Sequence, residues 1–470
     1  MRHTENGTIS REQHLKIQSL TVRGLHGYIS FDLTFFQDLT FLIGINGSGK
    51  TSAVRAIMAL LTPAVRDLAR LEFERLQVTI TDDGEETIID AERNDSEISL
   101  GIKGMADRLT IPILPRPAFG PRISWEEHAL EYYREQEALH ARHPVLAHLS
   151  SLPTPMFLDL ERRAQVSAIR RSVGARLPSR EAHMSATLLS GTLLESLRDA
   201  QSIAEAAFRA NLAQQRQLAD GLKQDLIVTH FQAAAEDGRN EFSTSILSKE
   251  QVKKLKQRQR LLNASLAAIG MGAEEITKTV AGFFDEVYRI TERLRGKQLL
   301  ELLVEDNRDA QLVHRWLALL PQMGRINSVI EHVERYNREI DIVIRPIERY
   351  LELVNNFLQD SGKRLVFSPT GDLRISIVKS GIDRAITALS SGERQLVVIL
   401  THLLFNEGAK RANVLIIDEP ELSLHIRWQE QFVEALQGAS DGLQLILATH
   451  SPSIIMERVD QCVDVQESRS

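Results

Sequence analysis

Residues 44–51, with the sequence GINGSGKT, set the class of fold. They match the phosphate-binding pattern G-x-x-x-x-G-K-[ST] in full, between an apolar run at 39–43 and a helical pattern at 50–61. Glycines let the backbone curl so that its N–H groups face a phosphate, and the start of a helix adds partial positive charge. The pattern predicts a nucleotide-binding α/β domain. The alternative is a glycine-rich strand-to-helix turn that binds no nucleotide.

The residue types in this loop assign the expected contacts with ATP. Lys50 is expected to reach the β- and γ-phosphates, and the Thr51 hydroxyl is expected to bind Mg²⁺. The other positions expected to contact the nucleotide are Gly44, Asn46, Gly47, Ser48 and Gly49.

A second motif lies near the end of the chain, where the apolar run 414–417 is followed by Asp418 and Glu419. Asp418 suits a contact with Mg²⁺, and Glu419 is placed to orient and polarise the attacking water. An apolar strand that ends in two solvated acids is the simpler alternative. The phosphate-binding loop in the same chain favours the catalytic interpretation.

The segment LSSGERQ at 389–395 precedes a helical pattern and could be a simple helix N-cap. Together with the other motifs it resembles the signature LSGGQ of the ATP-binding-cassette ATPases, within the branch that holds the SMC and RecF ATPases. The resemblance implies that Ser390, Ser391 and Gly392 contact nucleotide. Ser391 replaces the first glycine of the family signature, and Glu393 occupies its last position, where this branch also accepts glutamate.

Two further segments extend the resemblance. DEPELSLH at 418–425 is similar to a segment of the OLD-type bacterial ATPases, although Ile426 stands where their proline follows. ATHSP at 448–452 resembles their switch-histidine segment, which implies that His450 contacts the γ-phosphate; a satisfied surface histidine is the alternative. The resemblance covers roughly residues 14–100 and 364–456.

The resemblance implies an α/β fold, an ABC-type P-loop ATPase head that is split by a large all-helical insertion. We expect a first head segment at 1–178, the insertion at 179–361 and a second head segment at 362–470. Heptads are not evident in the insertion, so a compact bundle of antiparallel helices is favoured over a long coiled coil. The family geometry also implies a head-to-tail dimer, or a higher oligomer, in which Ser390 and Gly392 of one copy cap ATP on the Lys50 loop of the other.

Shorter patterns predict the remaining elements. The dipeptide Asp83-Gly84 between two apolar runs predicts a hairpin, and residues 369–372 predict a second hairpin. The proline-rich segment 111–155 is interpreted as loops and short helices, followed by a buried strand at 155–160.

Gln165 is a weak candidate for the family's Q-loop glutamine. Two basic runs fit solvated surfaces best. For Lys249, Lys253, Lys254, Lys256, Arg258 and Arg260 the alternative is a nucleic-acid contact. For Arg162, Arg163, Arg170, Arg171 and Arg176 the alternative is a contact with the nucleotide or with acidic residues of a partner.

Composition limits the class of protein. The 470 residues carry a formal charge of −7, which argues against a globally basic nucleic-acid binder. Cys462 is the one cysteine, so the chain has no internal disulfide framework. No apolar run approaches the ~18 residues of a membrane span, and we expect a cytoplasmic protein without a membrane partner.

The combination of motifs resembles the stand-alone ATPase subunits of bacterial anti-phage systems such as Septu, whose partner is an HNH nuclease, and PARIS. Because 20 residues follow His450, we expect any nuclease to be a separate effector protein. One alternative is a RecF/SMC-like DNA-repair ATPase that binds DNA in its ATP state. Another is a nucleotide-stabilised scaffold with little turnover. Slow or regulated ATP hydrolysis is left open.

Overall fold

The computed structural model describes residues 15–115, 122–159, 193–231, 246–268, 270, 274–295, 308–422 and 424–466. The chain forms two compact units, one of residues 1–207 and 349–470 and one of residues 208–348. We call them the head unit and the insertion unit. Gln165 and the arginine run between 162 and 176 lie outside the described residues.

A parallel sheet of five strands, in the order β14-β3-β13-β12-β8, lies at the centre of the head unit. Its strands are β3 (Leu39–Ile43), β8 (Met156–Asp159), β12 (Val414–Asp418), β13 (Gln444–Ala448) and β14 (Cys462–Asp464). β12 and β13 are buried along their whole length, as expected for central parallel strands. Leu39 of β3 pairs with Leu445 of β13, so the sheet joins segments from both ends of the chain.

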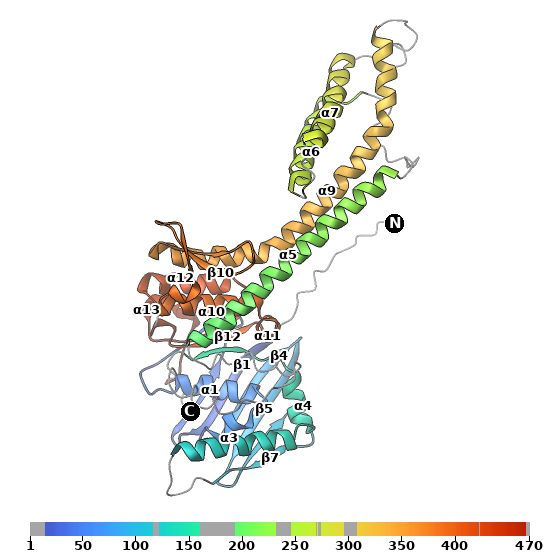
Figure 1. Ribbon diagram of the computed structural model, residues 1–470. Helices are drawn as coiled ribbons and strands as arrows, with labels where there is room; N and C mark the ends of the chain where they lie inside the picture. Colours follow the sequence, from blue (N-terminus) through green and yellow to red (C-terminus); the bar gives the residue numbers. More distant parts are fainter. Residues whose placement is uncertain are drawn as a thin grey trace. The chain divides into compact units, whose positions relative to one another are not determined.

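A second sheet is antiparallel, in the order β2-β1-β4-β5-β6-β7 (Figure 1). Its strands are β1 (Lys16–Leu25), β2 (Ile29–Thr34), β4 (Arg75–Asp82), β5 (Glu85–Arg93), β6 (Glu97–Ile102) and β7 (Leu109–Pro112). The hairpin predicted at Asp83-Gly84 is present, with φ +47° and +85° as a type I′ turn requires. β6 and β7 were not predicted.

A small antiparallel sheet in the order β11-β10-β9 contains the second predicted hairpin. It comprises β9 (Lys363–Phe367), β10 (Leu373–Ile377) and β11 (Ile382–Ala385). The helices of the head unit are α1 (Lys50–Leu61), α2 (Val65–Ala69), α3 (Arg122–Leu139), α4 (Pro144–Ser151), α10 (Ser391–Phe405), α11 (Glu407–Ala412), α12 (Ile426–Gln437) and α13 (Pro452–Ile455). The expectation of short helices before residue 155 was wrong for α3, which has 18 residues.

In the part of the segment between the two halves of the head that the structure describes, the helices are α5 (Leu193–Phe231), α6 (Lys249–Ala268), α7 (Glu274–Leu294) and α9 (Arg308–Leu358) (Figure 1). The start of α5 and the end of α9 belong to the head unit, where Tyr350 bonds the Thr401 hydroxyl of α10 at 2.8 Å. Within the insertion unit, Phe284, Trp316 and neighbouring aliphatic side chains form a separate core. An α/β fold that is split by a large helical insertion is therefore confirmed.

The longest described helix of the insertion contains two prolines. α9 runs for 51 residues and passes through Pro321 and Pro346. Each proline removes one helical hydrogen bond, which leaves the carbonyl four residues earlier without its usual donor. Those carbonyls belong to Leu317 and Ile342, which are two exposed residues of the helix.

The basic run on α6 faces solvent except at Arg258, which pairs with Glu334 at 3.1 Å. Lys256 also lies over the Tyr288 ring, 5.1 Å from its centroid.

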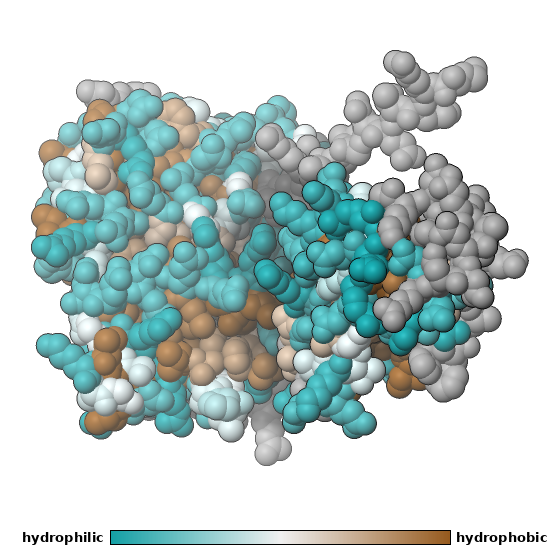
Figure 2. Space-filling model, turned by 90° about the horizontal axis from the view of Figure 1, so that it is seen from above, coloured by the Kyte–Doolittle hydropathy of each residue, from teal (hydrophilic) through white to brown (hydrophobic). Residues whose placement is uncertain are grey.

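Hydrophilic residues cover most of the face in Figure 2, with hydrophobic patches between them. In the part of the chain that the structure describes, no helix has both the length and the apolar character that a membrane crossing requires.

Candidate functional site

The loop between β3 and α1 has the curled backbone that its glycines predict. Gly44, Gly47 and Gly49 have φ values of +145°, +80° and +108°. A Cβ on Gly44 would lie 2.7 Å from Ser48 Oγ, so a larger residue cannot enter without moving the loop. The loop leads directly into α1 at Lys50, which brings the positive end of the helix to the loop.

Lys50 lies at the base of this loop and is only 5% exposed. Its Nζ donates to the carbonyls of Gly44 at 3.0 Å and Ile45 at 3.4 Å. Burial lowers the pKa of Lys50, and nearby negative charge opposes this shift. The carboxylates that supply this charge are Asp418, Glu419, Glu421 and Asp464. The sequence-predicted acids at 418 and 419 therefore lie close to the predicted phosphate-binding lysine.

The ends of β12 and β13 set the position of Glu419. Asp418 pairs with Ala448 across the two strands, and the Glu419 N–H donates to the Ala448 carbonyl at 2.9 Å. Asp418 is 5% exposed. Glu419 has a φ of +51°, a left-handed conformation that costs a non-glycine residue about 1–2 kcal/mol. Such a cost is often found at functional sites.

Glu421 fixes the segment that contains His450. One of its carboxylate oxygens accepts the Thr449 hydroxyl at 2.8 Å, and the other accepts the His450 backbone N–H at 2.7 Å. Thr449 is fully buried, and its hydroxyl also accepts the Ser451 N–H at 3.0 Å. The carboxylate therefore ties the end of β13 to the turn that follows β12.

These elements meet around a cavity of ≈370 Å³. The residues that line it include five of the predicted loop positions, the predicted base and the predicted switch histidine: Asn46, Gly47, Gly49, Lys50, Thr51, Glu419 and His450. His26 and Tyr28, in the turn between β1 and β2, also line the cavity. Tyr28 is 74% exposed, and His26 lies 3.3 Å from the Ser52 hydroxyl.

The signature residues lie elsewhere on the head unit. Ser390 caps α10, and Ser390 and Ser391 are exposed while Gly392 is buried. Of the described residues that line the cavity, none comes from 390–392. The structure therefore brings the loop, Glu419 and His450 together within one chain and does not bring the signature to them.

The donor set suits a magnesium–phosphate group. The cavity offers the loop, an ammonium and a hydroxyl at 47–51, and Asp418 lies close enough to interact electrostatically with Lys50. Hydroxyl and carboxylate oxygens are the ligands that Mg²⁺ prefers, and a curled glycine loop exposes N–H groups to phosphate oxygens. The residues present therefore fit both groups.

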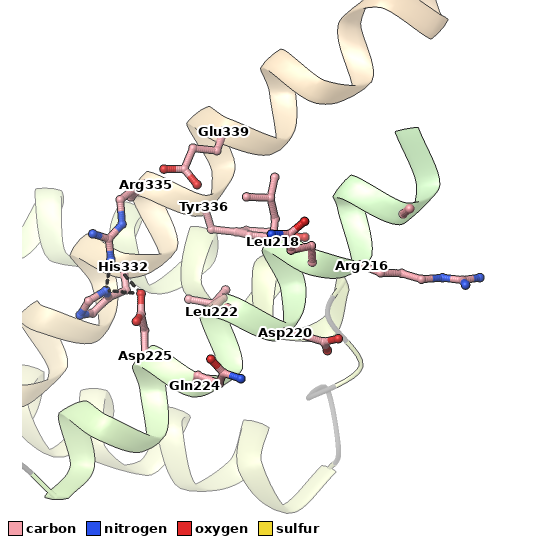
Figure 3. A pocket seen from close by; sticks show the side chains of 13 residues that line it. Arg216, Leu218, Asp220, Leu222, Gln224, Asp225, His332, Arg335, Tyr336 and Glu339 are labelled. Carbon is pink, nitrogen blue, oxygen red and sulfur yellow. Dashed lines mark hydrogen bonds and ion pairs between the residues drawn. The ribbon is translucent and has the colours of Figure 1, made fainter. Parts of the chain in front are cut away.

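The insertion unit contains a second cavity, of ≈820 Å³, between α5 and α9 (Figure 3). Arg335 and His332 of α9 both contact Asp225 of α5 there, at 2.9 Å and 3.1 Å. Charged groups of both signs line this cavity, and it shares no residue with the site around Lys50.

Comparison with known proteins identifies the class. The chain belongs to the AAA ATPase domain family, whose profile matches residues 15–455. It is 28% identical over 141 residues to the retron Vc95 probable ATPase of Vibrio cholerae serotype O1 biovar El Tor, which covers 28% of this chain and 27% of that protein. It is 22% identical over 176 residues to the retron Ec83 probable ATPase of Escherichia coli, with coverage of 35% and 31%. The matches thus span about a third of these relatives or less.

Among solved structures, the chain is similar to the Smc head domain of Pyrococcus furiosus with an extended coiled coil, bound to the C-terminal domain of ScpA. The identity is 15%, the TM-score is 0.38, and the match covers 94% of this chain and 91% of that one. The Smc head domain of Pyrococcus yayanosii gives the same identity and TM-score. The family match confirms the predicted ATPase class, whereas the roles of individual residues remain predictions.

Proposed function

We propose that the chain binds ATP in the cavity at Lys50 and hydrolyses it. The observation that carries this proposal is the meeting of the glycine loop, Lys50, Glu419 and His450 around one cavity. Loop N–H groups and Lys50 would hold the phosphates, with Thr51 and Asp418 as ligands of Mg²⁺. When bound, Mg²⁺ neutralises negative charge on the phosphates.

The carboxylate of Glu419 would orient the attacking water and accept its proton. His450 would face the γ-phosphate, with its backbone held by Glu421. The left-handed turn at Glu419 brings a carboxylate into the cavity wall, where glycine would be the less strained residue. Glu419 would thus act on the attacking water, and His450 would act on the γ-phosphate that the water attacks.

The ATP site would be completed by a second copy of the chain. Ser390 is exposed and lies outside the cavity of its own protomer, as a group that caps nucleotide on a partner must. In a head-to-tail dimer, Ser390, Ser391 and Gly392 would contact the phosphates bound to the other copy. ATP would then favour the dimer, because the γ-phosphate contributes contacts to both protomers.

In the cell, this ATPase would regulate a separate effector, such as an HNH nuclease, in anti-phage defence in the cytoplasm. The names of the two relatives, both probable ATPases of retrons, are consistent with this role. The head unit would carry the ATPase activity, and the insertion unit would offer a surface for the effector.

Three variants test the proposal. Lys50→Ala should abolish ATP binding, whereas Glu419→Gln should bind ATP, lose hydrolysis and accumulate as a dimer in size-exclusion chromatography. Ser390→Arg should block turnover while the monomer still binds ATP. Ser380→Arg, at an exposed turn of the β10–β11 hairpin, is the matched control. Wild-type turnover in Glu419→Gln would refute the assigned base, and wild-type turnover in Ser390→Arg would refute the composite site.

A further inference from the structure

We infer that Lys363 is a positioning residue for the signature serine and acts through the buried carboxylate of Glu393. This inference rests on the proposed composite ATP site. Lys363 lies on β9, Glu393 on the first turn of α10, and Ser390 at the N-cap of α10. None of the three lines the cavity at Lys50. The pair would therefore act on catalysis only through the shape of the signature segment.

Glu393 closes the N-terminus of α10 as a capping box. Its Oε2 accepts the Ser390 backbone N–H at 2.6 Å, and the Glu393 N–H donates to the Ser390 hydroxyl at 3.4 Å. The backbone and the hydroxyl of Ser390 are thus both held by residue 393. The direction of the exposed serine depends on where this carboxylate lies.

Two residues just after α9 fix that carboxylate in turn. Lys363 Nζ lies 2.7 Å from Oε2 and 3.0 Å from Oε1, and the Ser361 hydroxyl donates to Oε1 at 2.7 Å. Glu393 is 2% exposed, and the Lys363 side chain is 20% exposed. A buried carboxylate with three side-chain and backbone partners has little freedom to rotate.

The contacts of Glu393 favour a glutamate over a glutamine at this position. Burial alone would raise the pKa of Glu393, but the hydrogen bonds from Lys363, Ser361 and the Ser390 N–H outweigh it and lower the pKa. Glutamine at 393 would have only one oxygen for these donors, and its NH₂ group would face the ammonium or the Ser390 N–H. The charges of the side chains at 363 and 393 therefore need to be opposite.

A positioning role differs from a purely structural role in what it changes. If the pair only stabilises the fold, its loss lowers the melting temperature and leaves the kinetics of the folded protein unchanged. If the pair aims Ser390, the folded variant binds ATP normally as a monomer but turns it over slowly. Without Lys363, burial of Glu393 is less opposed and its pKa rises, so activity should also fall toward lower pH.

The test compares Lys363→Met, Lys363→Arg, Glu393→Gln and the double variant Lys363→Met/Glu393→Gln in the full chain. We expect Lys363→Met and Glu393→Gln each to lower kcat about tenfold or more, with ATP affinity of the monomer within about twofold of wild type. Lys363→Arg should keep most of the activity because it keeps the charge. The double variant should recover part of the loss, since no unpaired charge is left.

The control is Lys379→Met, the same substitution at an exposed turn of the same small sheet. Unchanged kcat and pH profile in folded Lys363→Met and Glu393→Gln would overturn the inference. If Lys363→Met does not fold, the kcat of Glu393→Gln alone decides. Ser390→Arg distinguishes failure of the positioning role from failure of the composite site. If Ser390→Arg loses turnover while Lys363→Met turns over ATP normally, only the positioning role is refuted. Normal turnover in Ser390→Arg refutes the composite site itself.

Discussion

Replacing Glu421 with alanine should release the segment that carries His450 and slow ATP hydrolysis without preventing ATP binding. The side chain makes two short hydrogen bonds, to the Thr449 hydroxyl and to the His450 N–H. Each hydrogen bond to a charged group contributes about 1.5–3 kcal/mol. Glu421 is half-buried, so we take the lower figure and obtain about 3 kcal/mol for the pair.

At about 1.4 kcal/mol per factor of ten, a free-energy loss of this size reduces the population of molecules with an ordered His450 segment by up to about a hundredfold. We therefore expect Glu421→Ala to lower kcat by between tenfold and about a hundredfold, with KM within about threefold of wild type. Steady-state kinetics measure both quantities. Glu434→Ala removes an equally charged but exposed side chain, which pairs with Arg458 at 3.3 Å, and is the matched control. A wild-type kcat in Glu421→Ala, with a large loss in His450→Ala, would refute the reasoning.

Three further outcomes follow from single groups. Burial lowers the pKa of His402 below its ordinary 6.5, so the unfolded chain takes up a proton before the folded chain as pH falls, and the free energy of unfolding decreases. His402→Leu should weaken this pH dependence of the free energy of unfolding, measured with urea between about pH 7.5 and 5.5. An unchanged pH dependence in the variant would contradict the assignment. At the left-handed φ of residue 419, Glu419→Gly should melt about 2–4 °C above Glu419→Ala, and the opposite order would show that the turn is unstrained. EDTA should weaken ATP binding in calorimetry, and less so in Asp418→Asn; equal effects would exclude Asp418 as a ligand.

Local signals predicted much of the head unit. β3, the glycine loop and α1 occur where the residues 39–61 place them, because the glycines and the helix start are encoded within a few positions. The turn at Asp83-Gly84 is equally local. β14 has only three residues and forms by pairing with β3, more than 400 positions earlier. No local pattern marks such a strand.

The same distinction applies to the site. The sequence motifs contain the loop, Asp418, Glu419 and His450, which the structure gathers at the carboxyl ends of β3, β12 and β13. Glu421 follows Glu419 by two positions, but its partners lie on the segment after β13. Tyr28 reaches the cavity from the β1–β2 turn, and the spacing along the chain contains no sign of it.

The charges around Lys50 suggest why the site should require a metal as well as a lysine. Four carboxylates interact with this one ammonium, and the added triphosphate is itself strongly negative. Loop N–H groups and the start of α1 supply only partial positive charge. Asp418 and Glu419 would therefore repel free ATP, and a divalent cation held by Thr51 and Asp418 would offset this repulsion. After hydrolysis, the same carboxylates would repel the released phosphate and so favour departure of the product.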